Sequence, residues 1–219
     1  MITLSEIKNN PVIDSFIRKG NQYLGTMGFT DHSYRHVNLV SNISRDILVS
    51  LNYSTREAEL AAIAGYVHDI GNVVSRNDHG TSGAIIVYPI LMEMGMEPDE
   101  VAVLLSSIAN HEEQYGQPVN AVAAALILAD KSDVHRSRVR NPDFATFDIH
   151  DRVNYAAESS SLKVDPERRT ITMELTIDIK ICPVMEYFEI FLTRMMLCRR
   201  AATFLNCNFE LIINGSKLL

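Results

Sequence analysis

The stretch AELAAIAGYVHDIGNVVSRNDHG, residues 58–80, begins as an apolar run and then places His68 directly beside Asp69. The apolar run predicts a buried helix, and Ser54 with Glu57 three residues later forms a capping box at its start. Polar groups in apolar surroundings cost free energy unless a partner satisfies them. The imidazole and the carboxylate at the end of this helix therefore either satisfy each other or bind something in common.

The sequence up to about residue 140 predicts further helices. Most of them carry a polar side chain at the point where their run of apolar residues ends. We expect helices over residues 31–52 with Asp31 as N-cap, 54–71, 79–95 with a kink at Pro89, 98–111 and 120–139. The polar side chains in question are His36, His68 with Asp69, His79, His111 and Asp130. Helices of a bundle can converge such groups on one interior point.

The sequence changes character near residue 160. Alternating residues on both sides of DPER, within 161–178, predict two strands joined by a turn. An amphipathic helix over 182–206 and a last strand over 209–215 follow. We therefore expect a mainly α protein, with a helical domain over residues 1–160 and a small C-terminal α+β unit, strand-strand-helix-strand, over residues 161–219.

Composition excludes several classes of function. The 219 residues carry a formal net charge of −7, which disfavours general binding to nucleic-acid backbone. The three cysteines form no C-x-x-C pair, which is typical of reduced thiols in a cytoplasmic protein. The N-terminal sequence does not resemble a signal peptide, and no apolar run approaches the roughly 20 residues that span a membrane.

The ordered set of histidines and aspartates resembles the HD superfamily of metal-dependent phosphohydrolases, over residues 30 to 140. The motifs that carry the resemblance are YRHV with His36, VHDIG with His68 and Asp69, HGTSGA with His79, NHEE with His111, and LADKSD with Asp130. Relatives that keep both middle histidines usually hold two metals. The resemblance thus implies a helical bundle with a dinuclear metal site that hydrolyses a phosphate ester or anhydride of a nucleotide or related molecule.

Two branches of this superfamily are similar, and neither match is close enough to transfer a substrate. The segment HEEQYGQPVNAVAAALILADKSDVH resembles the HD-GYP branch, which cleaves cyclic dinucleotides. That branch has Lys where this chain has Asn72, His where it has Asn110, and Gly-Tyr-Pro where it has GQPVN. The HGTSGA segment is nearer to bacterial enzymes that split diadenosine tetraphosphate.

A division of roles follows from the ligand types. One metal would be held by His36, His68 and Asp130 together with Asp69, and the other by His79 and His111. Asp69 is the natural bridge because a carboxylate has two oxygens, which makes it central to catalysis. Imidazole and carboxylate ligands favour Fe or Mn and leave Ni, Zn and Mg open. Lys131 and Arg35 are candidates to steady substrate phosphate, and Asp133 could orient a ligand histidine from behind.

Less specific interpretations remain for each residue. His68 and His111 could interact with helix dipoles, His36 and Asp130 could be satisfied core residues, and Lys131 with Asp133 could form a solvated salt bridge. His32 is best interpreted as a polar first-turn residue. At the level of function, the alternative is an inactive or weakly active domain that binds metal and nucleotide to regulate a partner. A homodimer through the C-terminal strands is also open.

Overall fold

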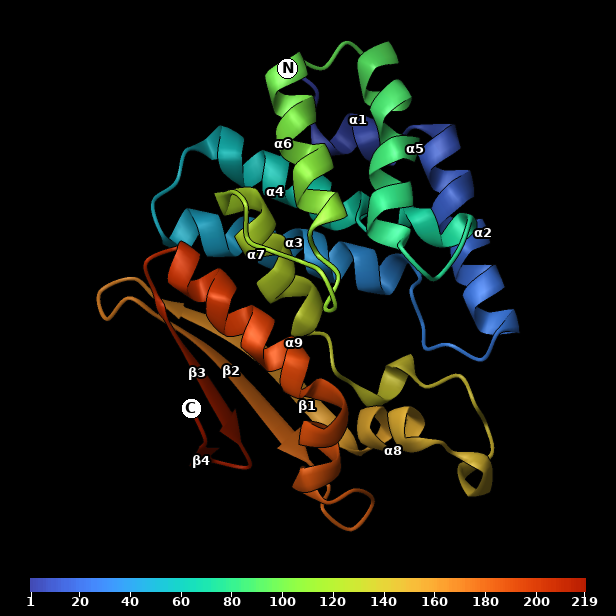
Figure 1. The fold of residues 1–219 in the computed structure, drawn as a ribbon, viewed down its shortest axis with the longest axis vertical. Helices are drawn as coiled ribbons and strands as arrows, with labels where there is room; N and C mark the ends of the chain where they lie inside the picture. Colours follow the sequence, from blue (N-terminus) through green and yellow to red (C-terminus); the bar gives the residue numbers. More distant parts are fainter.

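The computed structural model describes residues 1–219 as a body of helices with a small sheet attached. Figure 1 shows helices α1 to α7 gathered together, with α9 and the strands beside them. The helices of the body are α1 (Leu4–Lys8), α2 (Pro11–Thr26), α3 (Tyr34–Ser50), α4 (Thr55–Val67), α5 (His79–Glu93), α6 (Pro98–Ala109) and α7 (Ala121–Lys131). The predicted class, mainly helical with a C-terminal α+β unit, is confirmed.

The ends of α3, α4 and α7 differ from the prediction for local reasons. The N-cap of α3 is Ser33, because Asp31 instead accepts hydrogen bonds from the Ser33 backbone N–H and hydroxyl. Helix α4 starts with the predicted capping box but ends at Val67, and a 3₁₀ helix η1 (Ile70–Val73) takes the chain onward. Helix α7 ends at Lys131, well before residue 139, and the Ser132 side chain caps a carbonyl of its last turn.

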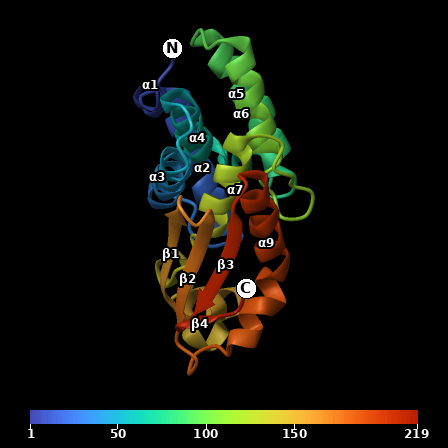
Figure 2. The same cartoon turned by 90° about the vertical axis from the view of Figure 1, so that its left-hand side faces the viewer.

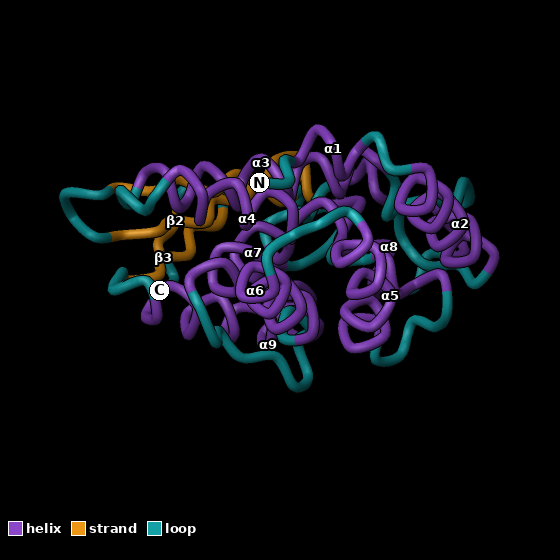
Figure 3. The backbone as a smooth tube through the Cα atoms, turned by 90° about the horizontal axis from the view of Figure 1, so that it is seen from above, coloured by secondary structure: helices purple, strands orange, loops and turns teal.

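Helix α4 is the centre of the body and is buried on nearly all sides. It packs against α3, α6 and α7, and Figure 3 shows α4, α6 and α7 close together when the molecule is seen from above. A Cβ at Gly65 would lie 2.8 Å from the Cα of Ser41, so the absence of a side chain lets α3 and α4 cross with their backbones almost touching. The Ser41 hydroxyl donates to the Ala62 carbonyl at 2.7 Å across this crossing.

The C-terminal unit is one sheet covered by one helix. It comprises β1 (Ala157–Asp165), β2 (Thr170–Ile177), α9 (Val184–Phe204), β3 (Asn208–Ile213) and β4 (Ser216–Lys217). Strand β1 pairs antiparallel with β2, β2 parallel with β3, and β3 antiparallel with β4, because α9 connects β2 to β3 as a crossover. In Figure 1 α9 lies in front of the sheet, and in Figure 2 β1, β2 and β3 run side by side.

The segment before this sheet is more regular than predicted. Strand β1 starts at Ala157 rather than residue 161, and helix α8 (Ile149–Ala156) lies in a stretch for which no helix or strand was predicted. Asp148 caps α8 by accepting a hydrogen bond from the Asp151 N–H at 2.8 Å. Helix α9 also packs against α7, so the C-terminal unit contacts the helix that carries Asp130. No helix has the length and apolar character needed to cross a bilayer.

Candidate metal centre

Six of the side chains predicted from the sequence converge in the middle of the helical body. They are His36 in α3, His68 at the end of α4, Asp69 at the start of η1, His79 at the start of α5, His111 just after α6, and Asp130 in α7. The four histidine side chains are at most 7% exposed, and the two aspartate side chains at most 12%. Segments nearly a hundred residues apart in sequence therefore meet in one buried site.

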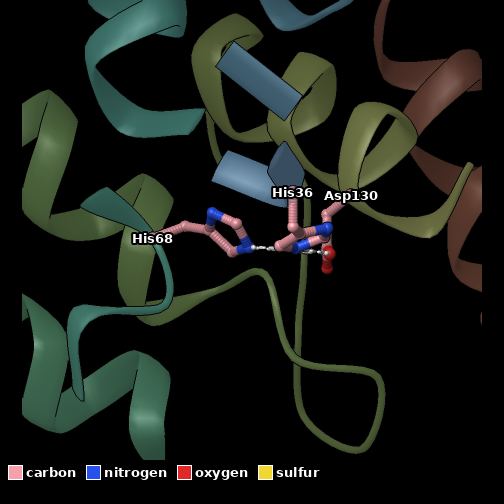
Figure 4. A group of neighbouring side chains, drawn as sticks. All are labelled: His36, His68 and Asp130. Carbon is pink, nitrogen blue, oxygen red and sulfur yellow. Dashed lines mark hydrogen bonds and ion pairs between the residues drawn. The ribbon is translucent and has the colours of Figure 1, made fainter. Parts of the chain in front are cut away.

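The first group of donors consists of His36, His68 and Asp130, which Figure 4 shows facing one another. The Nε2 atoms of His36 and His68 are 3.3 Å apart. Asp130 Oδ1 lies 3.4 Å from the first of these nitrogens and 3.5 Å from the second. Oδ2 of Asp69 adds a second carboxylate oxygen at 3.4 Å and 3.3 Å from the same nitrogens.

The second group consists of His79 and His111, on the other side of Asp69. Their Nε2 atoms are 3.1 Å apart. The other oxygen of Asp69, Oδ1, lies 3.2 Å from His79 Nε2 and 4.0 Å from His111 Nε2. The Asp69 carboxylate therefore presents one oxygen to each group.

In each of the four histidines, the hydrogen bond made by Nδ1 orients the ring so that Nε2 points to the centre of the site. Each Nδ1 lies 2.6–3.0 Å from a group that only accepts hydrogen bonds, so each Nδ1 carries a hydrogen. The acceptors are the Asp133 carboxylate for His36 and the carbonyls of Gly65, Arg76 and Ile108 for His68, His79 and His111. In its neutral form, each of the four rings therefore aims an Nε2 lone pair at the centre.

This arrangement requires positive charge between the donors. Two nitrogen lone pairs at 3.1–3.3 Å repel each other unless a proton or a metal ion lies between them. Asp69 Oδ2 is buried and accepts no hydrogen bond. An unpaired buried carboxylate oxygen is costly, and carboxylates buried in this way are paired or coordinate metals. The residues present thus fit divalent metal ions, with an N/O donor set suited to transition metals.

The pKa values differ between the two groups. Burial by itself lowers the pKa of His68, but the Asp69 and Asp130 carboxylates outweigh it and raise this pKa to about 10. Burial and the neighbouring His79 and His68 hold the pKa of His111 well below its usual value. Without a metal, the first group therefore carries a proton near neutral pH, whereas His111 is neutral.

The predicted phosphate-binding residues lie at different places. The Lys131 ammonium is 2.5 Å from Asp130 Oδ2, next to the first group, and is 6% exposed. Arg35 contacts both oxygens of Asp133 at 2.7 and 3.0 Å. Because Asp133 lies on the Nδ1 side of His36, the Arg35 guanidinium is behind that ring rather than beside its Nε2 atom, and its role in phosphate binding stays a prediction.

Several supporting residues were not assigned from the sequence. The Asn72 amide donates to the Asp69 carbonyl at 2.9 Å and to Oδ1 at 3.1 Å, so the residue that departs from the HD-GYP pattern holds the shared carboxylate. Glu112 accepts from the Gly80 N–H at 2.6 Å and thereby ties His111 to the start of α5. Its position directly after His111 was the only sequence signal.

His32 and the buried Arg138 form a further support. His32 Nε2 is 3.9 Å from Asp69 Oδ2 and accepts a hydrogen bond from Arg138 Nη2 at 3.2 Å. Because Arg138 also donates to the Asp133 carbonyl at 2.8 Å, it connects the segment before α3 to the segment after α7. The interpretation of His32 as a polar first-turn residue is wrong, because His32 lies before α3 and is buried, where the guanidinium holds it.

Residues 30–135, which contain all six converging side chains, match the family model of the HD domain. This part of the chain is therefore an HD domain, and the resemblance predicted from the ordered histidines and aspartates is confirmed. The chain is also similar to the uncharacterized protein MJ1020 of Methanocaldococcus jannaschii, with 25% identity over 186 residues, 74% of this chain and 71% of the relative. That relative's name assigns no activity.

Proposed function

We propose that the chain is a metal-dependent phosphohydrolase that cleaves a phosphate ester or anhydride of a nucleotide or a related small molecule. The observation that carries this proposal is the Asp69 carboxylate, whose two oxygens face two different pairs of imidazole nitrogens. On this proposal His36, His68 and Asp130 hold one divalent metal, His79 and His111 hold a second, and Asp69 holds both. Iron and manganese suit this set of nitrogen and oxygen donors best.

The chain's own residues supply orientation and local charge. Metal ions bound in pairs polarise a phosphoryl oxygen and lower the pKa of a water that attacks phosphorus. The Asp133 carboxylate and three backbone carbonyls fix the four rings, so the nitrogens are preorganised before any ligand arrives. Lys131 lies next to Asp130 and supplies positive charge on the side of the first group. A small anionic substrate also accords with the net charge of −7, because the positive charge needed is local.

The test combines metal content with turnover. Protein purified without chelator should contain two equivalents of transition metal per chain and should hydrolyse bis-p-nitrophenyl phosphate or p-nitrophenyl phosphate with added Mn²⁺ or Fe²⁺. Asp69→Asn keeps the size of the side chain but removes the shared charge, so we expect activity to fall at least about a hundredfold, with loss of metal. Asp46→Asn, at an exposed position of α3, is the matched control and should behave as the unmodified protein.

Two results would contradict the proposal in different ways. Full turnover by Asp69→Asn would show that the shared carboxylate is not part of the reaction. Tight binding of metal and nucleotides without hydrolysis of any phosphate compound would instead favour a regulatory binding domain.

A further inference from the structure

Two consecutive glutamates follow His111, and they face opposite sides of the site. Glu112 contacts the start of α5, as described above, whereas Glu113 faces the C-terminal unit. Both Nε and Nη2 of Arg194, in α9, lie 2.8 Å from Glu113 Oε1. The same oxygen is 3.7 Å from the Lys131 ammonium. One carboxylate oxygen is therefore shared by two cations, one from each part of the molecule.

The Arg194 side chain is held in place. Its guanidinium carbon is 4.0 Å from the centre of the Phe191 ring, and Phe191 is a buried residue of the same helix. Only 17% of the Arg194 side chain is exposed, against 28% for Glu113. The fork of the guanidinium therefore has a fixed direction, and its carboxylate partner is reached from solvent.

These cations lie beside the candidate metal centre. Lys131 contacts Asp130 Oδ2 at 2.5 Å, while the other oxygen of Asp130 faces the histidines of the first group. The Arg194 guanidinium and the Lys131 ammonium both face one carboxylate oxygen of Glu113. Two cations arranged in this way can bind a phosphate oxygen as well as a carboxylate oxygen. Glu113 belongs to the segment between α6 and α7 that forms no helix or strand, so its side chain can leave without breaking a regular element.

We propose that Lys131 and Arg194 form a subsite for a second phosphate group of the substrate, and that the Glu113 carboxylate occupies this subsite when substrate is absent. This inference rests on the proposed function, because the first phosphate would be the one attacked at the metal centre. It narrows the substrate class to compounds with adjacent phosphates, such as a nucleoside di- or polyphosphate. It also gives the C-terminal unit a function, since α9 supplies a guanidinium beside the Lys131 ammonium of the HD domain.

The test measures binding rather than turnover, with probes that the protein cannot hydrolyse. Methylenebisphosphonate carries two phosphate-like groups and inorganic phosphate carries one, and both are titrated calorimetrically into metal-loaded protein. Arg194→Gln should weaken methylenebisphosphonate about tenfold or more, because a bidentate charged contact is lost. Glu113→Gln should tighten it, because the competing carboxylate is gone. Inorganic phosphate should change little in either variant, and Arg200→Gln, at an exposed position of α9, should leave both affinities unchanged.

The two substitutions are expected to change methylenebisphosphonate affinity in opposite directions, which distinguishes a phosphate subsite from a purely structural ion pair. If Glu113 and Arg194 only fasten α9 to the HD domain, both substitutions should act in the same direction, and that result would overturn the inference. Unchanged methylenebisphosphonate affinity in folded Arg194→Gln would overturn it as well. Should Arg194→Gln fail to fold, Arg194→Lys, which keeps the charge and loses the fork, is expected to give a smaller loss of affinity, and Glu113→Gln still decides the sign. A protein that binds the bisphosphonate as expected but hydrolyses nothing would refute the proposed function alone.

Discussion

The two groups of histidines around Asp69 are built differently. His36, His68 and Asp130 lie within or at the end of long helices that pack against one another at the centre of the body. His79 is the first residue of α5 and His111 follows the end of α6, so both are attached to connecting segments. The first group therefore depends on helix packing, and the second depends on how two chain segments are held.

The supports behind the rings differ at one histidine, because a carboxylate holds His36, whereas a backbone carbonyl holds His68 as it does each ring of the second group. Behind His36 stands the Asp133 carboxylate, which Arg35 and Arg138 hold in turn. Behind His79 and His111 stand backbone carbonyls of neighbouring residues, with Glu112 as the one carboxylate nearby. A carboxylate partner makes a ligand histidine more basic and fixes its orientation. We expect the first group to bind its metal more tightly than the second.

The largest effect on metal content and turnover is expected when one histidine is removed from each group in turn. His68→Ala removes a nitrogen from the centre of the first group, and we expect less than one metal per chain and no turnover. His111→Ala should retain about one metal per chain, because the first group keeps all four of its donor side chains. Metal analysis after gel filtration measures both, and equal losses in the two variants would show that the groups do not differ.

The pH dependence should separate the groups as well. Since the pKa of His68 is raised to about 10, this ring is protonated below that pH in the metal-free protein, and metal must displace the proton. Apparent affinity at the first group should therefore fall about tenfold for each unit by which pH decreases, or about a hundredfold between pH 8.5 and 6.5. Because the pKa of His111 is lowered, that ring has no proton to lose in this range.

Calorimetric titration of Mn²⁺ into His111→Ala and His68→Ala isolates the first and the second group, respectively. A steep dependence on pH is expected in the first titration and a shallow one in the second. The reverse order would contradict the assignment of the proton to His68.

The smallest expected effect concerns the two asparagines that depart from the HD-GYP pattern. Asn72 holds Asp69 Oδ1, the oxygen that faces the second group, so Asn72→Ala should weaken binding of the second metal about tenfold. The Asn110 amide donates to the Ser106 carbonyl within α6 instead. Asn110→Ala should therefore leave metal affinity unchanged, and the two titrations compared side by side check whether only the first asparagine supports the site.

The sequence predicted the side chains that meet but not what surrounds them. Their order along the chain and their places at helix ends follow from helical periodicity and caps, which are local properties. The contact between Arg194 and Glu113 joins residues 81 positions apart through the packing of α9 on α7, and no local pattern encodes it. Asp133 was found because it is one turn beyond Asp130, whereas Arg138 and His32 become visible only when the segments fold together.

Boundary errors had local causes. Helix α7 was predicted too long because no Gly or Pro occurs in residues 132–139 to mark an end, although the chain turns after Lys131 and forms a separate 3₁₀ helix. Helix α8 was missed because it is short. The only mark of its start is the N-cap Asp148, whose side chain accepts a hydrogen bond from the Asp151 N–H. The extent of the two predicted domains stays a prediction, and strand β1 runs across the expected boundary at residue 160.

The missing side chain at residue 65 has a consequence for the choice of ion. The crossing of α3 and α4 at this point carries His36 on one helix and His68 on the other, so the thickness of that contact sets how far apart their nitrogens stand. A single methyl group added there would force the two backbones apart and widen the space between the rings. The size of cation that the candidate metal centre can hold would then depend on a position that touches no ligand.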